Sequence, residues 1–180
     1  MMSRELLRGL RHGPDRLLHP FRHRRAMRRL REMRPRRVLV MCLGNICRSP
    51  YVERVLRREA PHLDVRSAGF LEAGRTSPRE AVSVAAQHGV NLTDHRSVQV
   101  TTELLGWADL VLVMDGRQAM RVQSLGNGVP VERLGDFDPG KIDTRTVIDP
   151  IDRERAFFDR IYTRADACCV AFARSLGRGV

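Results

Sequence analysis

Four short apolar runs predict the strands of this chain. Residues 38–41 and 110–114 are continuous apolar runs, which is typical of strands buried on both faces of a sheet. Residues 65–68 and 128–134 predict two further strands. Each run is followed by a segment of helical spacing or by a loop that contains glycine or proline, so the strands are expected to be separated by helices.

Helical patterns fill much of the chain between these runs. One helix is predicted from Pro50, because proline suits a first helical turn, to about residue 60. Another is predicted to begin with Ser77 as N-cap and Glu80 three residues later. Apolar residues at helical spacing over 157–172 predict a final amphipathic helix. Alternating strands and helices indicate an α/β fold in which helices cover both faces of a parallel sheet, with the active site beyond the carboxyl ends of the strands.

The first 36 residues form an arginine-rich extension that differs from the domain expected over residues 37–180. Thirteen arginines face three acidic residues within positions 1–37, so this stretch carries +10 of the net charge of +11 and the rest is nearly neutral. Gly13-Pro14 and His19-Pro20 are expected to break any long helix. A short amphipathic helix is predicted over residues 22–33, with Ala26, Met27, Leu30 and Met33 on one face.

The function of this extension stays open at the level of sequence. Its arginine charge suits an anionic membrane surface or an acidic partner. Nucleic acid is disfavoured because, of the residues that could stack on bases, the extension contains only Phe21. A disordered tail, or upstream sequence added by an early start, is the alternative that the sequence slightly favours. His19 and His23 have the spacing of a metal pair, but without a third ligand they are expected to be solvated.

Length and composition exclude several classes of protein. The chain of 180 residues has the size of one domain, and its 42% hydrophobic residues suffice for a core. No apolar window is long enough for a transmembrane helix, and no secretory signal is evident. Four cysteines do not make a disulfide framework, so a cytoplasmic location is expected. Cys168 and Cys169 are interpreted as helix packing.

Candidate chemistry lies in the loop after the first strand, Cys42-Leu43-Gly44-Asn45-Ile46-Cys47-Arg48-Ser49-Pro50. A cysteine six residues before an arginine is by itself weak evidence of a reactive cysteine in this chain. Arginine makes up 31 of the 180 residues, and Cys168 and Arg174 have the same spacing. The surrounding sequence distinguishes Cys42 from Cys168, because only Cys42 follows a predicted strand and precedes a glycine-containing loop.

The loop has the residues needed to hold a phosphate. Gly44 is expected to take a positive φ and Asn45 tolerates the left-handed region, so the backbone N–H groups can converge on an anion. The following helix adds its positive end, and Arg48 can grip two phosphate oxygens. Cys42 is expected to be a thiolate nucleophile at neutral pH, and Ser49 could donate a hydrogen bond to it.

The chain resembles the low-molecular-weight protein tyrosine phosphatases over about residues 37–176, with Cys-x-Gly-Asn-x-Cys-Arg-Ser-Pro as that family's signature. The resemblance implies a flavodoxin-like, three-layer α/β fold with a four-stranded parallel sheet, and hydrolysis of phosphotyrosine through a cysteinyl phosphate on Cys42. It also implies that no metal or other cofactor is needed. The phosphate would be held by the loop amides and Arg48, that is, by Leu43, Gly44, Asn45, Ile46, Cys47, Arg48 and Ser49.

The same resemblance implies one catalytic aspartate in an Asp-Pro pair. Two pairs compete, Asp138-Pro139 and Asp149-Pro150. The first fits a structural element that precedes the catalytic pair in the family, so Asp149 is predicted to be the general acid and base. Ile151 stands where many members have an aromatic residue beside the substrate ring, which leaves the preference among phosphomonoesters open.

Several finer assignments also stay open. His95 is expected to support the loop from behind, for example through Asn45, and Cys47 is either a redox partner of Cys42 or a buried side chain without a role. The alternative functions are a phosphoarginine phosphatase, an arsenate reductase that uses an external thiol, and a phosphate-binding module without catalysis. Ile46 favours the tyrosine branch, because phosphoarginine phosphatases tend to have threonine there. A phosphotyrosine protein, such as a bacterial tyrosine kinase, is the expected substrate.

Overall fold

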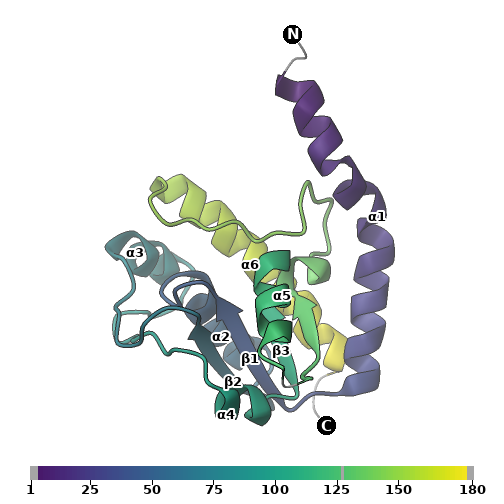
Figure 1. Cartoon of the computed structure of the whole chain (residues 1–180). Coiled ribbons are helices and arrows are strands. Elements are labelled where there is room, and N and C mark those ends of the chain that lie inside the picture. The colour runs from purple at the N-terminus through teal and green to yellow at the C-terminus, as the bar shows by residue number, and fades with distance from the viewer. Residues whose placement is uncertain (1–3, 127, 178–180) are drawn as a thin grey trace.

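The computed structural model describes residues 4–126 and 128–177. Its elements, in chain order, are α1 (Arg4–Met33), β1 (Arg37–Cys42), α2 (Arg48–Glu59), β2 (Asp64–Gly69), α3 (Arg79–Gln87), α4 (Thr102–Trp107), β3 (Leu110–Val113), α5 (Gly116–Ser124), β4 (Val131–Arg133), the 3₁₀ helix η1 (Leu134–Phe137) and α6 (Arg155–Leu176) (Figure 1). No helix among these residues is long and apolar enough to cross a membrane.

The four strands form one parallel sheet in the order β2-β1-β3-β4. Val40 of β1 lies between Ser67 of β2 and Leu112 of β3, so β1 is central and its carboxyl end opens between two neighbours. The predicted α/β architecture with a four-stranded parallel sheet is therefore confirmed. The fourth strand is shorter than predicted, because Gly128 takes a positive φ of 71° and Pro130 lacks an N–H.

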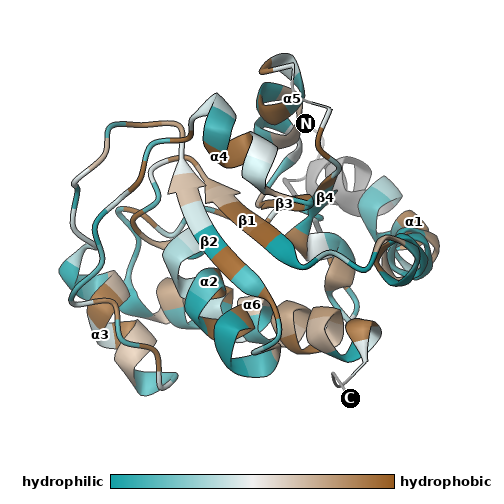
Figure 2. Cartoon of the chain, turned by 90° about the horizontal axis from the view of Figure 1, so that it is seen from below, coloured by the Kyte–Doolittle hydropathy of each residue, from teal (hydrophilic) through white to brown (hydrophobic). Residues whose placement is uncertain are grey.

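Alternate residues of the central strands point into two separate cores. Val38 and Val40 face a large core that is covered by α2, α3 and α6, whereas Leu39 and Met41 face a smaller core covered by α4 and α5 (Figure 2). This alternation explains why residues 38–41 of β1 are all apolar, and it gives the predicted three layers.

The N-terminal extension forms one helix, so the prediction that Gly13-Pro14 and His19-Pro20 break it was wrong. Pro14 and Pro20 lie inside α1, and Figure 1 shows the helix axis bending between its two halves. Each proline removes a helical hydrogen bond, which costs about 3 kcal/mol. Packing against the domain offsets this cost, since Ala26 and Leu30 are buried in the larger core with Met27 and Met33 beside them. The predicted apolar face is therefore correct.

Two histidines attach α1 to the domain, which corrects the expectation that they are solvated. His19 is buried, and its Nε2 lies 2.9 Å from the carbonyl oxygen of Asp138. Nδ1 of His23 lies 3.0 Å from the carbonyl oxygen of Asp136. Their spacing of four residues therefore places two donors on the face that packs against the domain. The helix lies along the β4 edge of the sheet, where Arg29 pairs with Glu132 at 3.0 Å (Figures 1 and 2).

The start of α3 also differs from its prediction. Pro78, not Ser77, is the N-cap, and no side chain caps the helix. The hydroxyl of Ser77 is buried without a hydrogen-bond partner among the described residues. Because the helix begins one residue later than the capping-box pattern indicated, the Ser77 hydroxyl is out of register with the free N–H groups of the first turn.

A cluster of polar and aromatic side chains joins α2, α3 and α6 behind the phosphate loop. The rings of Tyr51 and Tyr162 stack with centroids 3.7 Å apart, and the Tyr51 hydroxyl donates to Asp166 at 2.9 Å. His88 places its two ring nitrogens 2.9 Å from Asp166 and from Asp159. Burial opposes protonation of His88, but the two carboxylates outweigh it and raise the pKa of His88 above its ordinary value.

The raised pKa of His88 predicts a pH-dependent contribution to stability. A group whose pKa is higher in the folded state stabilises that state fully below its unfolded pKa of about 6.5, and the contribution disappears as the pH rises through the folded pKa. His88→Gln is therefore expected to lower the free energy of unfolding by about 1–2 kcal/mol at pH 6 and by less at pH 9. Urea titrations at both pH values measure the difference. His62→Gln, an exposed histidine, is the control, and an equal loss at both pH values for His88→Gln would contradict the ion-pair interpretation.

Candidate active site

The loop between β1 and α2 forms a small cavity at the carboxyl edge of the sheet. Cys42 is the last residue of β1, and α2 begins at Arg48, two residues before the predicted Pro50. The cavity has a volume of about 100 Å³ and is lined by Cys42, Leu43, Gly44, Ile46, Cys47, Arg48, Leu71, Arg75, Asp149 and Ile151. The first residues of α2 have free backbone N–H groups, so this cavity is suited to an anion.

Hydrogen-bond donors surround the sulfur of Cys42. The backbone N–H of Asn45 donates to Sγ at 3.3 Å, and the Ser49 hydroxyl lies 3.0 Å from it. Nδ2 of Asn45 donates to the Ser49 oxygen at 2.9 Å. Because that oxygen already accepts a hydrogen bond, its own proton is free to point at the sulfur. Two hydrogen-bond donors are therefore directed at the sulfur of Cys42.

Asn45 holds the loop in shape with every polar atom of its side chain. The residue is fully buried and takes a positive φ of 49°. Its second Nδ2 proton goes to Ser67 at 2.9 Å, and its Oδ1 accepts from the backbone N–H of Val98 at 2.8 Å. His95 Nε2 lies 2.7 Å from the Asn45 carbonyl oxygen. The structure therefore brings His95 behind the loop, against Asn45.

Gly44 does not have the positive φ expected of it; Asn45 alone turns the loop into the left-handed region. Gly44 instead keeps the cavity mouth open, because a Cβ there would meet Nη1 of Arg75 at 3.3 Å. The backbone of the phosphate loop comes closer still to Gly69, at the end of β2. A Cβ at Gly69 would lie 2.8 Å from the backbone nitrogen of Asn45 and 2.9 Å from the carbonyl oxygen of Leu43. The sequence alone did not indicate this role of Gly69.

Gly69→Ala is expected to displace the phosphate loop. The added methyl group overlaps backbone atoms, which cannot rotate away, so we expect a loss of about 1–3 kcal/mol in the free energy of unfolding. Activity towards an aryl phosphate is expected to fall about tenfold or more, since small displacements of a positioned loop reduce rates strongly. Gly106→Ala is the matched control, because a Cβ at this helical position meets nothing within 4 Å. Equal behaviour of the two variants would refute the tight contact.

Arg48 and Asp149 face each other across the cavity. Nη1 of Arg48 donates to the carbonyl oxygen of Val147 at 2.9 Å, and Nη2 donates to Oδ2 of Asp149. Nε of Arg48 is buried and has no hydrogen-bond partner among the described residues. The guanidinium therefore has an unused donor beside the cavity, while Asp149 is about one-third exposed at the cavity mouth.

The competing aspartate lies elsewhere and is fully engaged. Asp138 is buried, and its Oδ2 accepts from Nε of Arg164 at 2.7 Å. Its Oδ1 accepts from the backbone N–H of Gly140 at 2.9 Å. Asp138 is absent from the residues that line the cavity. Its carboxylate therefore holds the segment after η1 in place, whereas Asp149 is within reach of a bound group.

The mouth of the cavity is apolar and contains one further arginine. Leu43, Leu71 and Ile151 are each between 37% and 43% exposed there, so aliphatic side chains stand where a substrate ring would enter. Arg75 comes from the loop after β2, which sequence reasoning did not connect with the site. Its only sequence signal was one arginine among many, so pattern alone could not have found it.

The remaining cysteines differ from Cys42 in their surroundings. Cys47 is buried beside the cavity, and burial, with the nearby Cys42, raises the pKa of its thiol. Cys168 and Cys169 lie in α6 within the larger core, as predicted, and burial raises their pKa values too. Among the described residues, no group of three or more His, Cys, Asp or Glu side chains is arranged to hold a metal ion.

Comparison with known proteins identifies the family. The family model described as low molecular weight phosphotyrosine protein phosphatase matches residues 37–180. A relative named EpsP from Ralstonia nicotianae, a probable low molecular weight protein-tyrosine-phosphatase, is 37% identical over 123 residues, which cover 68% of this chain and 83% of the relative.

Solved structures agree with this match. The crystal structure of the tyrosine phosphatase AmsI from Erwinia amylovora is 31% identical, with a TM-score of 0.73 over 80% of this chain and 95% of that chain. The arginine phosphatase YwlE from Geobacillus stearothermophilus is 28% identical, with a TM-score of 0.69 over 79% of this chain and 93% of that chain. Given the family match over residues 37–180 and the 37% identity to EpsP, this chain belongs to the low molecular weight protein-tyrosine-phosphatase family, whose members are hydrolases of phosphotyrosine.

Proposed function

We propose that the protein hydrolyses phosphotyrosine in proteins through a cysteinyl-phosphate intermediate. The observation that carries this proposal is the convergence of Cys42, Arg48 and Asp149 on one cavity of about 100 Å³. The Cys42 thiolate attacks phosphorus, and the bond from phosphorus to the tyrosine oxygen breaks. Arg48 and the backbone N–H groups of residues 43–49 hold the phosphoryl oxygens. Asp149 gives the departing phenolate a proton and then takes one from the water that hydrolyses the intermediate.

In this mechanism, binding of the substrate breaks the ion pair between Arg48 and Asp149. A phosphate dianion that binds Arg48 competes with the Asp149 carboxylate for the guanidinium N–H groups. A phosphate that takes over the N–H groups of Arg48 releases the Asp149 carboxyl group at the cavity mouth. Substrate binding therefore frees this group to act on the leaving oxygen.

Three supporting roles belong to the same proposal. Ser49 donates a hydrogen bond to the Cys42 sulfur as it leaves phosphorus, while Asn45 and His95 keep the loop in its binding shape. When peroxide oxidises Cys42 to a sulfenic acid, the Cys47 thiol displaces water to form a disulfide that external thiols reduce.

We place the protein in the cytoplasm, where it acts on a phosphotyrosine protein such as a bacterial tyrosine kinase. Its basic extension faces an anionic surface or an acidic partner.

Steady-state hydrolysis of matched phosphotyrosine, phosphoserine and phosphoarginine peptides tests the proposal, in the presence of reductant and a metal chelator. We expect phosphotyrosine to be preferred. Phosphoarginine is included because the YwlE arginine phosphatase has the same fold, and a preference for it would transfer the protein to that specificity and refute our interpretation of Ile46. No turnover of any peptide would refute the phosphatase mechanism, and arsenate reduction with an external thiol would then be measured.

A further inference from the structure

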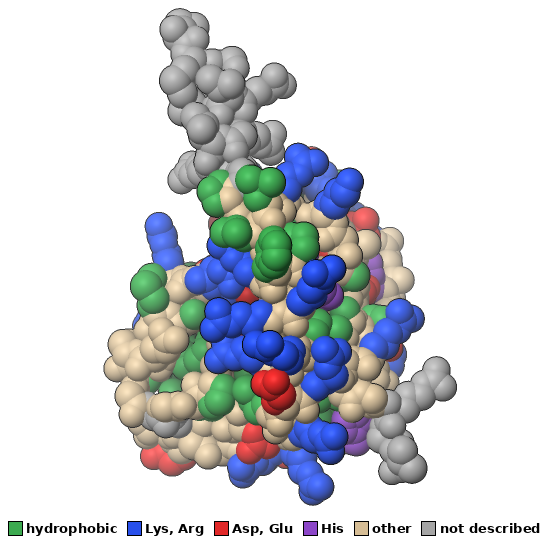
Figure 3. All heavy atoms as spheres, turned by 90° about the vertical axis from the view of Figure 1, so that its right-hand side faces the viewer, with side chains coloured by type: hydrophobic (Ala, Val, Ile, Leu, Met, Phe, Trp, Pro, Cys, Tyr) green, Lys and Arg blue, Asp and Glu red, His purple; other side chains and the backbone are tan. Residues whose placement is uncertain are grey.

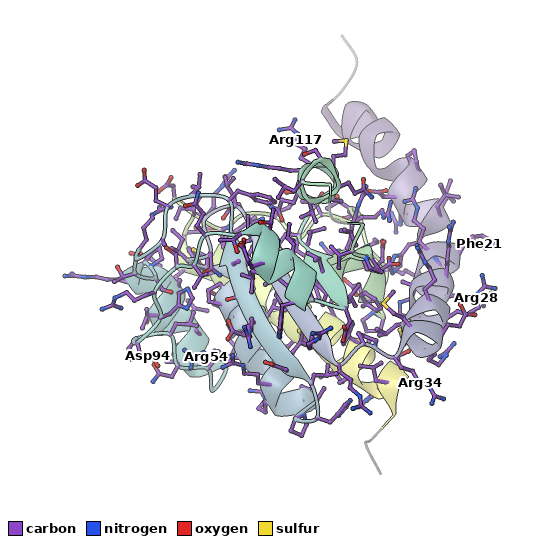
Figure 4. All side chains as sticks on the ribbon, turned by 60° about the horizontal axis from the view of Figure 1, so that its bottom comes forward. Phe21, Arg28, Arg34, Arg54, Asp94 and Arg117 are labelled. Atoms are coloured by element: carbon purple, nitrogen blue, oxygen red, sulfur yellow. The ribbon has the colours of Figure 1, made fainter. Side chains whose placement is uncertain are left out.

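The outward face of α1 carries the most exposed apolar side chains of the described structure. Leu17 is 77% exposed and Phe21 is 69% exposed, with Leu18 beside them at 45%. Leu17 and Phe21 stand four residues apart, so they share a helix face, and this face is opposite the buried Ala26 and Leu30. Figure 4 shows Phe21 pointing away from the domain. No packing within the described residues accounts for these side chains, although three large apolar groups in one patch are costly to leave in water.

Arginines continue the same face towards the end of the helix. Arg24 and Arg28 follow Phe21 at spacings of three and four residues, and Arg28 points outward with it in Figure 4. Positions 14–33 contain seven arginines and two acids, so this part of α1 carries +5. Both acids are already paired, Asp15 with Arg22 and Glu32 with Arg28. In Figure 3 hydrophobic side chains gather at the upper end of this face and basic ones cover its middle.

We propose that α1 docks on a membrane surface that contains anionic phospholipids. Leu17, Leu18 and Phe21 enter the boundary between headgroups and acyl chains, and the arginines contact the lipid phosphates. Arginine side chains suit this position, because their stems lie along apolar surface while their guanidinium groups reach the phosphates. The sequence indicated the basic charge of this surface but not its apolar part, because Leu17, Leu18 and Phe21 lie on either side of the proline that was expected to break the helix.

Other occupants fit these observations less well. A single-stranded nucleic acid would meet the arginines, but it offers no apolar layer for two leucines. A second copy of the chain would bring two copies of this arginine-rich face together, which is unfavourable. An acidic protein could satisfy the charge, and the test below separates that case by its dependence on Leu17 and Phe21.

The position of this face relates it to the active site. His19 and His23 contact the carbonyl oxygens of Asp138 and Asp136, which follow β4 at its carboxyl end. Cys42 ends β1 at that same edge of the parallel sheet. Docking through α1 therefore holds the catalytic edge beside the membrane and favours phosphoproteins at the membrane surface. The docking itself does not depend on the proposed phosphatase mechanism.

Sedimentation of the full chain with vesicles tests this inference. We expect binding to vesicles of phosphatidylcholine with phosphatidylserine, weakening as salt is raised, and little binding to vesicles of phosphatidylcholine alone. Arg24→Gln combined with Arg28→Gln is expected to weaken binding about 30-fold. Leu17→Ser combined with Phe21→Ser is expected to weaken it at least about tenfold. The side chains are exposed, so turnover of a small aryl phosphate should stay as in the wild type and report that each variant is folded.

Arg54→Gln combined with Arg66→Gln is the matched control. It removes the same charge from α2 and β2, far from α1, and Figure 4 places Arg54 on the opposite side of the molecule. Loss of binding in this control equal to that of the Arg24 and Arg28 variant would overturn the inference. So would no binding of the wild type to phosphatidylserine vesicles. Binding to poly-glutamate or to RNA at the same strength, without any effect of the Leu17 and Phe21 variant, would assign the face to an acidic polymer instead.

Discussion

Cys42→Ser is expected to abolish turnover of phosphotyrosine while the protein stays folded. The substitution replaces a sulfur that receives the Asn45 N–H at 3.3 Å and the Ser49 hydroxyl at 3.0 Å. A serine hydroxyl at this position stays protonated at neutral pH, and the two groups that contact it, the Asn45 N–H and the Ser49 hydroxyl, are not bases that could remove the proton. We expect kcat to fall by about 10⁴-fold or more, as for the loss of a nucleophile in other covalent enzymes. Steady-state release of phosphate measures the effect, and binding of vanadate or phosphate shows that the cavity is intact.

Cys47→Ser is the matched control for that variant. Cys47 lies in the same loop and is also buried, but burial raises the pKa of its thiol, so it is not ionised at neutral pH. We expect this variant to keep most of its turnover under reducing conditions. After peroxide treatment it should recover less activity with an external thiol than the wild type does. If instead Cys47→Ser were inactive and Cys42→Ser active, the nucleophile would be Cys47 and not Cys42.

The sequence was most informative where one short motif and one apolar run coincide. Residues 38–41 could only be a buried strand, and the following loop carried both the nucleophile and Arg48, so their position at the sheet edge followed from the topology. The role of Asn45 was predictable in part, because asparagine tolerates the left-handed region. Its contact with His95 was also expected. Its contacts with Ser67 and Val98 were not, since both residues come from distant segments without a local signal.

Local rules failed where packing outweighed them. Two prolines predicted breaks in α1, yet the helix continues because Ala26 and Leu30 are buried in the core and two histidines contact the domain. A pattern that predicted a helix only over residues 22–33 could not register these long-range contacts. Gly69 and Arg75 escaped prediction for a related reason, because a glycine at the end of a strand and one arginine among 31 carry no local signal of the loop that they approach.

Asp149→Asn is expected to slow the release of phenol from phenyl phosphate by about 10²–10⁴-fold, the usual worth of a general acid. Asparagine cannot donate a full proton to the leaving oxygen, so the loss falls on leaving groups that need one. Release of p-nitrophenol should be much less affected, because p-nitrophenolate is stable without a proton. Single-turnover measurements of both phenols isolate this first step. Asparagine also removes the carboxylate that competes for Arg48, so inorganic phosphate should inhibit the variant more strongly than the wild type.

Asp138→Asn separates this catalytic role from a structural one. The Asp138 carboxylate pairs with Arg164 at 2.7 Å in a buried place, so its loss leaves a partly buried guanidinium uncompensated. We expect the free energy of unfolding to fall by about 3 kcal/mol, while the rate of phenol release by the folded protein changes little. The dependence on the leaving group should stay as in the wild type. If Asp138→Asn gave the leaving-group dependence and Asp149→Asn only the loss of stability, the general acid would be Asp138. The 2.9 Å hydrogen bond from Gly140 to Asp138 would then have to open during catalysis.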